Sequence, residues 1–334
     1  MAETGFLGYV SAFDDSQFPE NGVKDGYRYE RVYVTKEPQT YTGAYLWQKD
    51  MKSFEKDVDC PYDFWGGCVV TTNDDLHILS GGNNNTKHHK FNGISWSKVS
   101  TLPFDLYGGF AVALNNEIHI LSSGSSSSSL KHYKWNGSSW TSVSELPYDC
   151  HYGSVVAWNG EIHILGGQNS SYQKYHYKWD GTVWSSVSTL SYDFNGGSVV
   201  VYNNEIHIIG GGYNTTNQKS HYKWNGSSWT SISTLPYCLW HGAAVIYNNE
   251  IHILGTAYSG CQKYHYKWNG TVWSSVSVLP IYYSYGQAAI YNDEIHVLYH
   301  DHYYFKTTYV VDDSSSAYPA DGDEDDYHYK RISD

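Results

Sequence analysis

The chain of 334 residues lacks the features that mark several common classes of protein. It has no run of 18 apolar residues, so we expect no helix that spans a membrane. Its formal net charge is −13, and no cluster of Lys and Arg offers a nucleic-acid surface. The first residues, Met-Ala-Glu-Thr-Gly, have neither the basic nor the apolar region of a secretory signal. We therefore predict no nucleic-acid partner, no membrane insertion and no export by that route.

Cysteine and helical patterning are also scarce. The five cysteines are an odd number and form no Cys-x-x-Cys pair, which argues against a metal or redox site. We expect free thiols, with a Cys60–Cys68 disulfide as the alternative. No stretch shows a 3.6-residue period, whereas Tyr, Trp and Gly number 34, 13 and 31. Aromatic residues and glycine favour strands and tight turns, so the composition indicates an all-β protein.

One motif is repeated six times along the chain. An apolar-His-apolar signature recurs with its histidine at His77, His119, His163, His207, His252 and His296. The steps between these histidines are 42, 44, 44, 45 and 44 residues. A repeat of this length, made of short alternating apolar runs, is typical of a β-propeller, a closed ring of four-stranded sheets.

Each repeat indicates four strands, which we name a to d from the inside outward. Strand a is a small apolar run such as 197–200, strand b holds the repeated histidine, strand c ends in an aromatic residue, and strand d begins at a tryptophan. Because the histidines occupy the same place in every repeat, we assign them to hydrogen bonds between strands rather than to a metal. We expect the tryptophans to pack between neighbouring blades.

The repeats resemble the kelch repeat. Three copies end strand b in a glycine pair, at 81–82, 166–167 and 210–211, and strand c carries a tyrosine with a tryptophan about six residues later. This resemblance covers about residues 41–311. It implies a kelch-like propeller but no single function, because propellers host many activities.

Six a–b pairs are present but only five complete sets of four strands. We therefore predict an all-β, six-bladed kelch-like propeller over residues 41–312, closed by N-terminal strands. Residues 45–47 and Phe54 indicate the diverged c and d strands of the last blade, although either terminus offers a strand c. Short extensions, 1–40 and 313–334, flank the propeller.

The two extensions share a pattern. Residues 18–32 and 318–332 both contain aromatic-Pro-x-x-Gly-x-x-Asp-Gly/Asp-Tyr-x-Tyr, which indicates a turn followed by a short strand. The pattern resembles a segment of tail and other structural proteins of phages and prophages of Gram-positive bacteria. This resemblance implies a virion component, assembled in the host cytoplasm, that contacts other virion proteins through its extensions.

Variation between repeats falls on one face of the propeller. Strand direction places the d–a and b–c loops together, and the d–a loop keeps its length while its residues change. The fourth position after its proline (Ser191 in one copy) is Trp65, Tyr107, His151, Asn195, Trp240 and Ser284. Loops on a rigid scaffold commonly bind ligands, whereas drift in solvent loops explains large aromatic residues poorly. We predict that the ligand site contains Trp65, Tyr107, His151, Asn195, Trp240, Tyr283 and Tyr285.

Aromatic platforms with Asn, Ser and His donors suit sugar rings. We therefore predict a non-enzymatic propeller on a phage particle that binds a host-surface glycan or receptor, without catalytic residues, metal or cofactor. Kelch-like propellers also include sugar-processing enzymes such as sialic acid mutarotases, which gives one alternative, and a protein-docking scaffold of the virion is the other. An ionisable pair unique to one blade and deep in the funnel would favour the enzyme, and a flat aromatic face would favour binding.

Overall fold

The computed structural model describes residues 60–62, 64, 66–72, 75–80, 86–106, 108–122, 130–168, 171, 173–212, 214–256, 263–279, 283 and 285–298 with their side chains, and Ser123 with strands β1–β6 and β29–β31 as backbone. The chain divides into two units, 54–307 and the pair of terminal segments 1–53 and 308–334. Within the described ranges the helical structure is a short 3₁₀ turn, η2 (Asn217–Lys219), and no helix has the length and apolarity needed to cross a bilayer.

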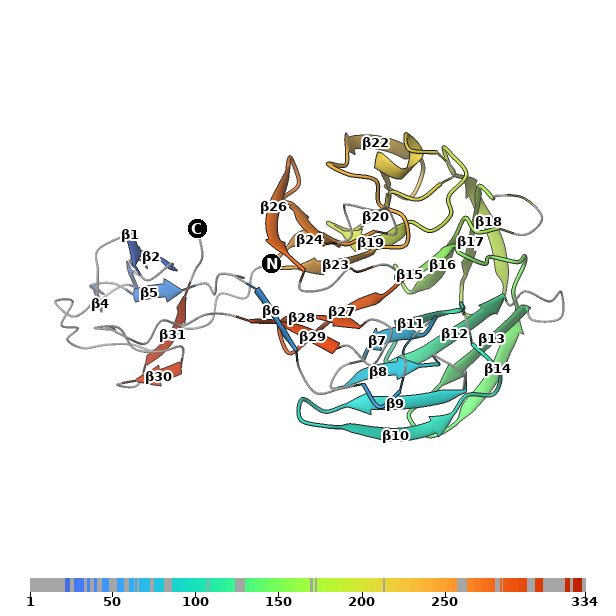
Figure 1. The fold of residues 1–334 in the computed structure, drawn as a ribbon, viewed down its shortest axis with the longest axis horizontal. Coiled ribbons are helices and arrows are strands. Elements are labelled where there is room, and N and C mark those ends of the chain that lie inside the picture. Colours follow the sequence, from blue (N-terminus) through green and yellow to red (C-terminus); the bar gives the residue numbers. More distant parts are fainter. Residues whose placement is uncertain are drawn as a thin grey trace. The chain divides into compact units, whose positions relative to one another are not determined.

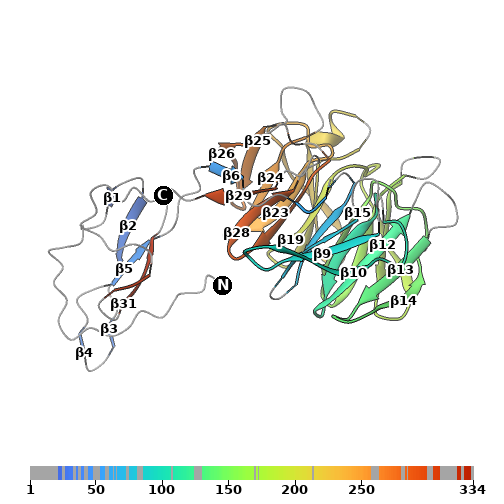
Figure 2. The same cartoon turned by 60° about the horizontal axis from the view of Figure 1, so that its bottom comes forward.

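The larger unit is a β-propeller, seen in two orientations in Figures 1 and 2. Five blades are each built from four consecutive antiparallel strands, which correspond to the predicted strands a to d. In chain order the blades comprise β7 (Cys68–Thr71), β8 (Leu76–Leu79), β9 (Lys87–Phe91) and β10 (Trp96–Thr101); β11 (Phe110–Leu114), β12 (Glu117–Ser123), β13 (Leu130–Trp135) and β14 (Trp140–Glu145); β15 (Ser154–Trp158), β16 (Glu161–Leu165), β17 (Tyr175–Trp179) and β18 (Trp184–Thr189); β19 (Ser198–Tyr202), β20 (Glu205–Ile209), β21 (Ser220–Trp224) and β22 (Trp229–Thr234); β23 (Ala243–Tyr247), β24 (Glu250–Leu254), β25 (Tyr264–Trp268) and β26 (Trp273–Val278).

The innermost strands form a closed ring. β7, β11, β15, β19, β23 and β27 (Gln287–Tyr291) each contact the next, and β27 contacts β7. A further four-stranded sheet has the order β27, β28 (Glu294–Leu298), β29 (Tyr304–Thr308), β6 (Ser53–Lys56). Five blades, each of four consecutive strands, are therefore complete where the sequence predicted six. Closure of the further sheet by an N-terminal strand stays a prediction.

The smaller unit contains both terminal motifs, which form matching hairpins. β1 (Gly22–Lys24) pairs with β2 (Tyr27–Val32), and β30 (Gly322–Glu324) pairs with β31 (Tyr327–Arg331) in the same register. β5 (Ala44–Trp47) joins the hairpins into a sheet of order β1-β2-β5-β31-β30. The interpretation of residues 45–47 as a propeller strand was therefore wrong. The units divide at 53/54 and 307/308, whereas the sequence indicated 40/41 and 312/313.

The structure also describes a separate short sheet and four of the five cysteines. β3 (Thr35–Lys36) pairs with β4 (Gln39–Thr40) in a separate two-stranded sheet. Cys60, Cys68, Cys150 and Cys238 form no disulfide with one another, so the alternative of a Cys60–Cys68 disulfide was wrong. The fifth cysteine, Cys261, lies outside the described residues.

The repeated histidines form a hydrogen-bonded relay in each complete blade. In the second blade His119 Nδ1 lies 2.8 Å from His132 Nε2, and His132 Nδ1 lies 3.1 Å from Ser144 Oγ. The Nε1–H of Trp184, in the next blade, donates to Ser144 Oγ at 3.1 Å. The equivalent chains are His77–His88–Ser100–Trp140, His163–His176–Ser188–Trp229, His207–His221–Ser233–Trp273 and His252–His265–Ser277. The predicted structural role of the strand-b histidines is confirmed.

The tryptophan fixes the direction of one hydrogen bond in the relay. An indole N–H can only donate, so Ser144 Oγ accepts from Trp184. The bonds between His119 Nδ1 and His132 Nε2 and between His132 Nδ1 and Ser144 Oγ take their direction from the histidine tautomers. Burial lowers the pKa of His119 to about 4 and that of His132 to about 3, which keeps them neutral.

Tryptophan pairs pack between neighbouring blades, as predicted. His88 of the first blade lies between Trp135 and Trp140 of the second, with ring centroids 5.4 and 5.6 Å apart respectively. Trp135 is only 7% exposed and joins the apolar cluster that contains Leu79 and Phe104 of the first blade. The relay and this packing together hold each blade to the next.

Candidate functional site

The d–a and b–c loops meet on one face of the propeller. In the third blade the Gln168 N–H of the b–c loop donates to the His151 carbonyl of the d–a loop at 2.7 Å. The Phe194 N–H donates in the same way to Gln173 O at 3.2 Å, and the Leu239 N–H donates to Gln218 O at 2.8 Å. These bonds fix the loops to each other, so variable residues are displayed on a rigid surface, as strand direction predicted.

The third position of the d–a loop is part of the core. Its residues are fully or almost fully buried: Phe64, Leu106, Cys150, Phe194, Leu239 and Tyr283. Tyr283, which the sequence placed in the ligand site, has an exposed fraction of 0%. Its ring fills the space beside Gly255 and Gly286, where a Cβ would collide with it. A ligand cannot reach this side chain unless the loop opens, so we remove it from the candidate site.

The residues at the fourth position of the d–a loop have two different roles: some are exposed near the funnel, and one is buried and holds the loop in place. His151 is partly exposed, and its ring lies over Gly108, where a Cβ would come 3.1 Å from His151 Cε1. Asn195 is 3% exposed, and its amide donates to Gln168 Oε1 at 3.3 Å, so it anchors the loop instead of facing a ligand. Trp65 and Tyr107, the other members predicted at this position, lie outside the described residues.

Trp240 is the partly exposed aromatic residue of this position in the fifth blade. Its backbone N–H donates to Thr256 Oγ1 at 3.2 Å, which holds the loop against the b–c loop. Its ring packs on His241 with centroids 4.5 Å apart. A Cβ at Gly196 would come 2.6 Å from Trp240 Nε1, so the glycine of the preceding blade makes room for the indole.

The fifth position of the d–a loop lies at the mouth of the central funnel. Of its six residues, the sequence predicted only Tyr285 as part of the ligand site. Its residues are Gly66, Gly108, Tyr152, Gly196, His241 and Tyr285, and all six take a left-handed φ between 53° and 70°. A chain of backbone hydrogen bonds imposes this conformation. The N–H of Gly196 donates to Tyr152 O, that of His241 to Gly196 O, and that of Tyr285 to His241 O, at 2.7 to 2.8 Å.

Three of these six positions carry a large side chain at a conformational cost. Glycine adopts a left-handed φ freely, and three blades use it, whereas Tyr152, His241 and Tyr285 do not have that freedom. Such a residue is strained by roughly 1 kcal/mol or more and persists only where the surroundings enforce it. Because glycine serves equally well in the neighbouring blades, the three side chains are not needed to form the turn. Strain of this kind is typical of functional sites.

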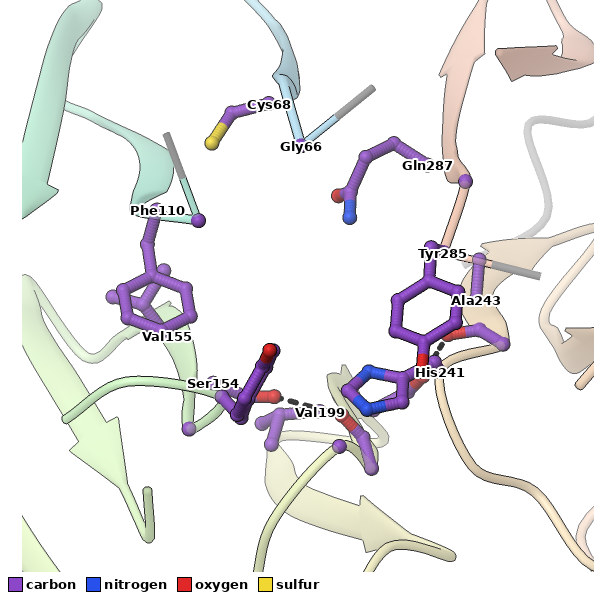
Figure 3. A pocket seen from close by; sticks show the side chains of 18 of the residues that line it. Gly66, Cys68, Phe110, Ser154, Val155, Val199, His241, Ala243, Tyr285 and Gln287 are labelled. Atoms are coloured by element: carbon purple, nitrogen blue, oxygen red, sulfur yellow. Dashed lines mark hydrogen bonds between the residues drawn. The ribbon is translucent and has the colours of Figure 1, made fainter. Parts of the chain in front are cut away.

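The three strained residues and the neighbouring Trp240 form one aromatic wall. The ring of His241 stacks on Tyr285, with centroids 4.2 Å apart and an interplanar angle of 23°. Tyr152 meets the same imidazole edge-on at 5.0 Å. Figure 3 shows His241 and Tyr285 together on one side of the funnel, with Cys68 and Phe110 across from them. We call Tyr152, Trp240, His241 and Tyr285 the aromatic wall.

Below its mouth the funnel is a cavity of about 420 Å³ lined by all six inner strands. Its next layer consists of Cys68, Phe110, Ser154, Ser198, Ala243 and Gln287. The Ser154 and Ser198 hydroxyls donate to Gly197 O at 2.9 Å and Gly242 O at 3.2 Å, so each ties its blade to the next. Burial raises the pKa of the Cys68 thiol to about 12, so this thiol is not a nucleophile at neutral pH.

None of the described residues that line the cavity is Asp, Glu, Lys or Arg, and the histidines among them are His151 and His241. Burial, followed by the proximity of His151, lowers the pKa of His241 to about 4, so its imidazole is neutral. Burial also raises the pKa of Tyr285, which keeps its hydroxyl protonated. In the described part of the chain no group of His, Cys, Asp and Glu could hold a metal ion. The site therefore offers aromatic faces and neutral hydrogen-bonding groups.

Comparisons with known proteins agree on the fold. No protein-family model matches the chain, and no curated protein matches its sequence. Among solved structures, one titled "Structure of YjhT" is similar, with a TM-score of 0.61 and 15% sequence identity, over 74% of this chain and 94% of that one. At this identity the likeness shows a shared β-propeller fold and no more.

Proposed function

We propose that this protein is a non-enzymatic binding propeller that recognises a glycan at the aromatic side of its central funnel. The observation that carries the proposal is the strain at Tyr152, His241 and Tyr285, where equivalent blades use glycine. Tyr152 and Tyr285 are 40% and 47% exposed, so their rings are accessible to a ligand. The apolar face of a sugar ring stacks on aromatic side chains, and its hydroxyls need the neutral donors and acceptors that this cavity has.

A sugar-processing enzyme is the second candidate, because the funnel holds an ionisable group unlike those of the other blades. The neutral imidazole of His241 is a base, and it stacks on the phenol of Tyr285, which is an acid. We favour binding because no described carboxylate or cation lines the cavity to stabilise charge that develops during a reaction. Proton NMR of a sugar that binds decides between them: an unchanged rate of exchange between its anomers supports binding.

We further propose that the propeller has six kelch-like blades and that β6 completes the last one, which the sheet order β27-β28-β29-β6 supports. We place the protein on a phage or related particle, where its terminal unit attaches it to other virion proteins. Two motifs from opposite ends of the chain form matching hairpins in one sheet, as an attachment module would require. Mass spectrometry of purified particles tests this placement, and absence of the protein from particles would contradict it.

A glycan array tests the binding proposal. The full-length protein should bind a defined set of glycans, and a variant with Tyr152→Gly, His241→Gly and Tyr285→Gly should lose this binding while remaining folded. The matched control is Asn204→Gly. It also places glycine where the backbone has a left-handed φ, here 60°, but it lies in an a–b turn. Binding by the triple variant, or equal loss in the control, would show that the aromatic wall is not the site. A docking scaffold would bind no glycan at all.

A further inference from the structure

We infer that the funnel takes the uncharged sugar residue at the end of a glycan chain and excludes acidic sugars. This inference rests on the proposed function and deepens it. It follows from two properties of the site, its charge and its shape.

The charge of the loops around the funnel excludes an anionic ligand. The six d–a loops contain no Lys or Arg; they are residues 61–67, 103–109, 147–153, 191–197, 236–242 and 280–286. In the b–c loops the lysines are Lys174, Lys219 and Lys263, each the last residue before strand c, and none of them lines the cavity. Four d–a loops instead carry an aspartate, and the chain as a whole has a charge of −13.

A carboxylate that enters this cavity therefore meets no lysine or arginine among the described residues that line it. Removing a carboxylate from water without a charged partner costs several kcal/mol, and the net negative charge of the chain also slows the approach of anions. His241 cannot supply the missing charge, because its imidazole stays neutral until the pH falls to about 4. Sialic and uronic acids are thus disfavoured, whereas a neutral hexose loses only hydroxyl hydration, which the polar groups of the site can replace.

The shape of the cavity selects a chain end. The cavity is lined by residues from all six inner strands, and these strands contact one another in a closed cycle, so it has no open side. An internal sugar residue is linked in two directions and needs a groove that is open at both ends. A terminal residue is linked once and can enter from the loop face. Ala244 and Ala288 deeper in the cavity leave space for it.

Gln287 is placed to recognise the hydroxyls of that residue. It is exposed in the cavity, and Figure 3 shows its amide directed into the funnel near Tyr285. An amide offers a donor and an acceptor together, which matches two neighbouring hydroxyls of a pyranose. Replacement by arginine at this position would add the positive charge that the natural cavity lacks.

Matched oligosaccharides on the array test the inference with the full-length protein. Pairs that end in glucose or glucuronic acid, galactose or galacturonic acid, and N-acetyllactosamine with or without a sialic acid cap differ at the chain end. The neutral member should bind at least about tenfold more strongly, the difference expected when a charge is buried without a partner. In Gln287→Arg the ratio should shift toward the acidic member. The same neutral sugar at an internal position should not bind.

The outcomes separate this inference from the proposed function. If no glycan binds, or if binding survives in the triple glycine variant, the proposed function fails. If binding depends on the aromatic wall but the wild type prefers the acidic member, or recognises an internal residue equally well, only the inference fails. Neutral terminal sugars that bind through the aromatic wall, with a ratio that Gln287→Arg shifts, support both.

Discussion

The chain uses histidine in two ways, and the two sets of histidines differ in their relation to the repeat. The relay histidines, such as His119 and His132, occur at the same place in every complete blade and are buried at 1% and 0% exposure. His241 occurs once, at a position where three other blades have glycine, and it is partly exposed beside the cavity. Burial lowers the pKa of both kinds, so the pKa does not distinguish them.

The two kinds of histidine differ in their effect on the stability of the fold. A relay histidine such as His132 hydrogen-bonds to groups in strands b and d, and its loss removes the partner of His119 Nδ1 and one of the two partners of Ser144 Oγ. His241 adopts a left-handed φ of 53° that glycine would adopt without strain. In a repeat protein, therefore, a residue that recurs and stabilises indicates structure, whereas a residue that departs from the repeat at a conformational cost indicates function.

The largest expected effect is the response of the relays to acid. The pKa values of His77, His119, His163 and His207 are lowered to about 4, and those of His88, His132, His176, His221 and His252 to about 3, mainly by burial. The unfolded state binds protons near the ordinary histidine pKa of about 6.5, so unfolding takes up protons below that pH. Stability is therefore complete above about pH 6.5 and is lost as the pH falls toward 4.

Each of these histidines contributes up to about 1.4 kcal/mol per pH unit in that window. Several together can exhaust the total stability of a typical domain, ~5–15 kcal/mol, within about one to two pH units. Urea unfolding followed by tryptophan fluorescence at pH 7.5, 6.0, 5.0 and 4.5 measures this loss. A free energy of unfolding that stays constant between pH 7.5 and 4.5 would show that the relays are not neutral and buried as described.

Breaking one relay should have the next largest effect. His132→Phe keeps the size of a side chain that is 0% exposed, but it removes the partner of His119 Nδ1 and one of the two partners of Ser144 Oγ. We expect a loss of about 2–4 kcal/mol in the free energy of unfolding, since an unsatisfied buried group costs ~1–3 kcal/mol and a lost hydrogen bond ~0.5–1.5 kcal/mol.

Val183→Ser is the control for this change, because Val183 is 58% exposed in a c–d turn and the equivalent residue of the second blade is Ser139. It should change stability by less than about 0.5 kcal/mol. Equal stability of His132→Phe and the wild type would mean that the relay contributes nothing to the fold.

Trp240→Ala should act on binding more than on stability. The indole is partly exposed and packs on His241 at the mouth of the funnel, where an aromatic contact typically dominates a binding site. We expect affinity for a glycan found on the array to fall by about 2 kcal/mol, measured by calorimetry. Asn204→Gly, in an a–b turn, is the comparison. If it weakens binding as much as Trp240→Ala does, the ligand face has been assigned to the wrong loops.

The repeat made most of the fold predictable, because its spacing and strand patterns specify a propeller. The inner strands, the hydrogen-bonding role of the strand-b histidines and the shared loop face all follow from it. The association of 44–47 with the terminal sheet did not, because an apolar run of four residues fits either sheet and only pairing decides. Half of the aromatic wall was missed for another reason: Tyr152 and His241 follow conspicuous residues at the fourth position. The sequence did contain a sign of them, because the fifth position of the d–a loop is glycine in three blades and a bulky residue in the other three. This pattern indicates a left-handed turn only once the backbone is known.

The most direct test of the central claim is a paired measurement of stability and binding for His241→Gly. The fifth position is glycine in three other blades, so the substitution removes strain at φ 53° while it removes the centre of the aromatic wall. We predict that glycan binding is lost, with at least a tenfold rise in Kd, and that the free energy of unfolding is unchanged or higher by about 1 kcal/mol. Retained binding, or a stability loss above about 2 kcal/mol, would show that His241 supports the fold and that the aromatic wall is not a ligand site.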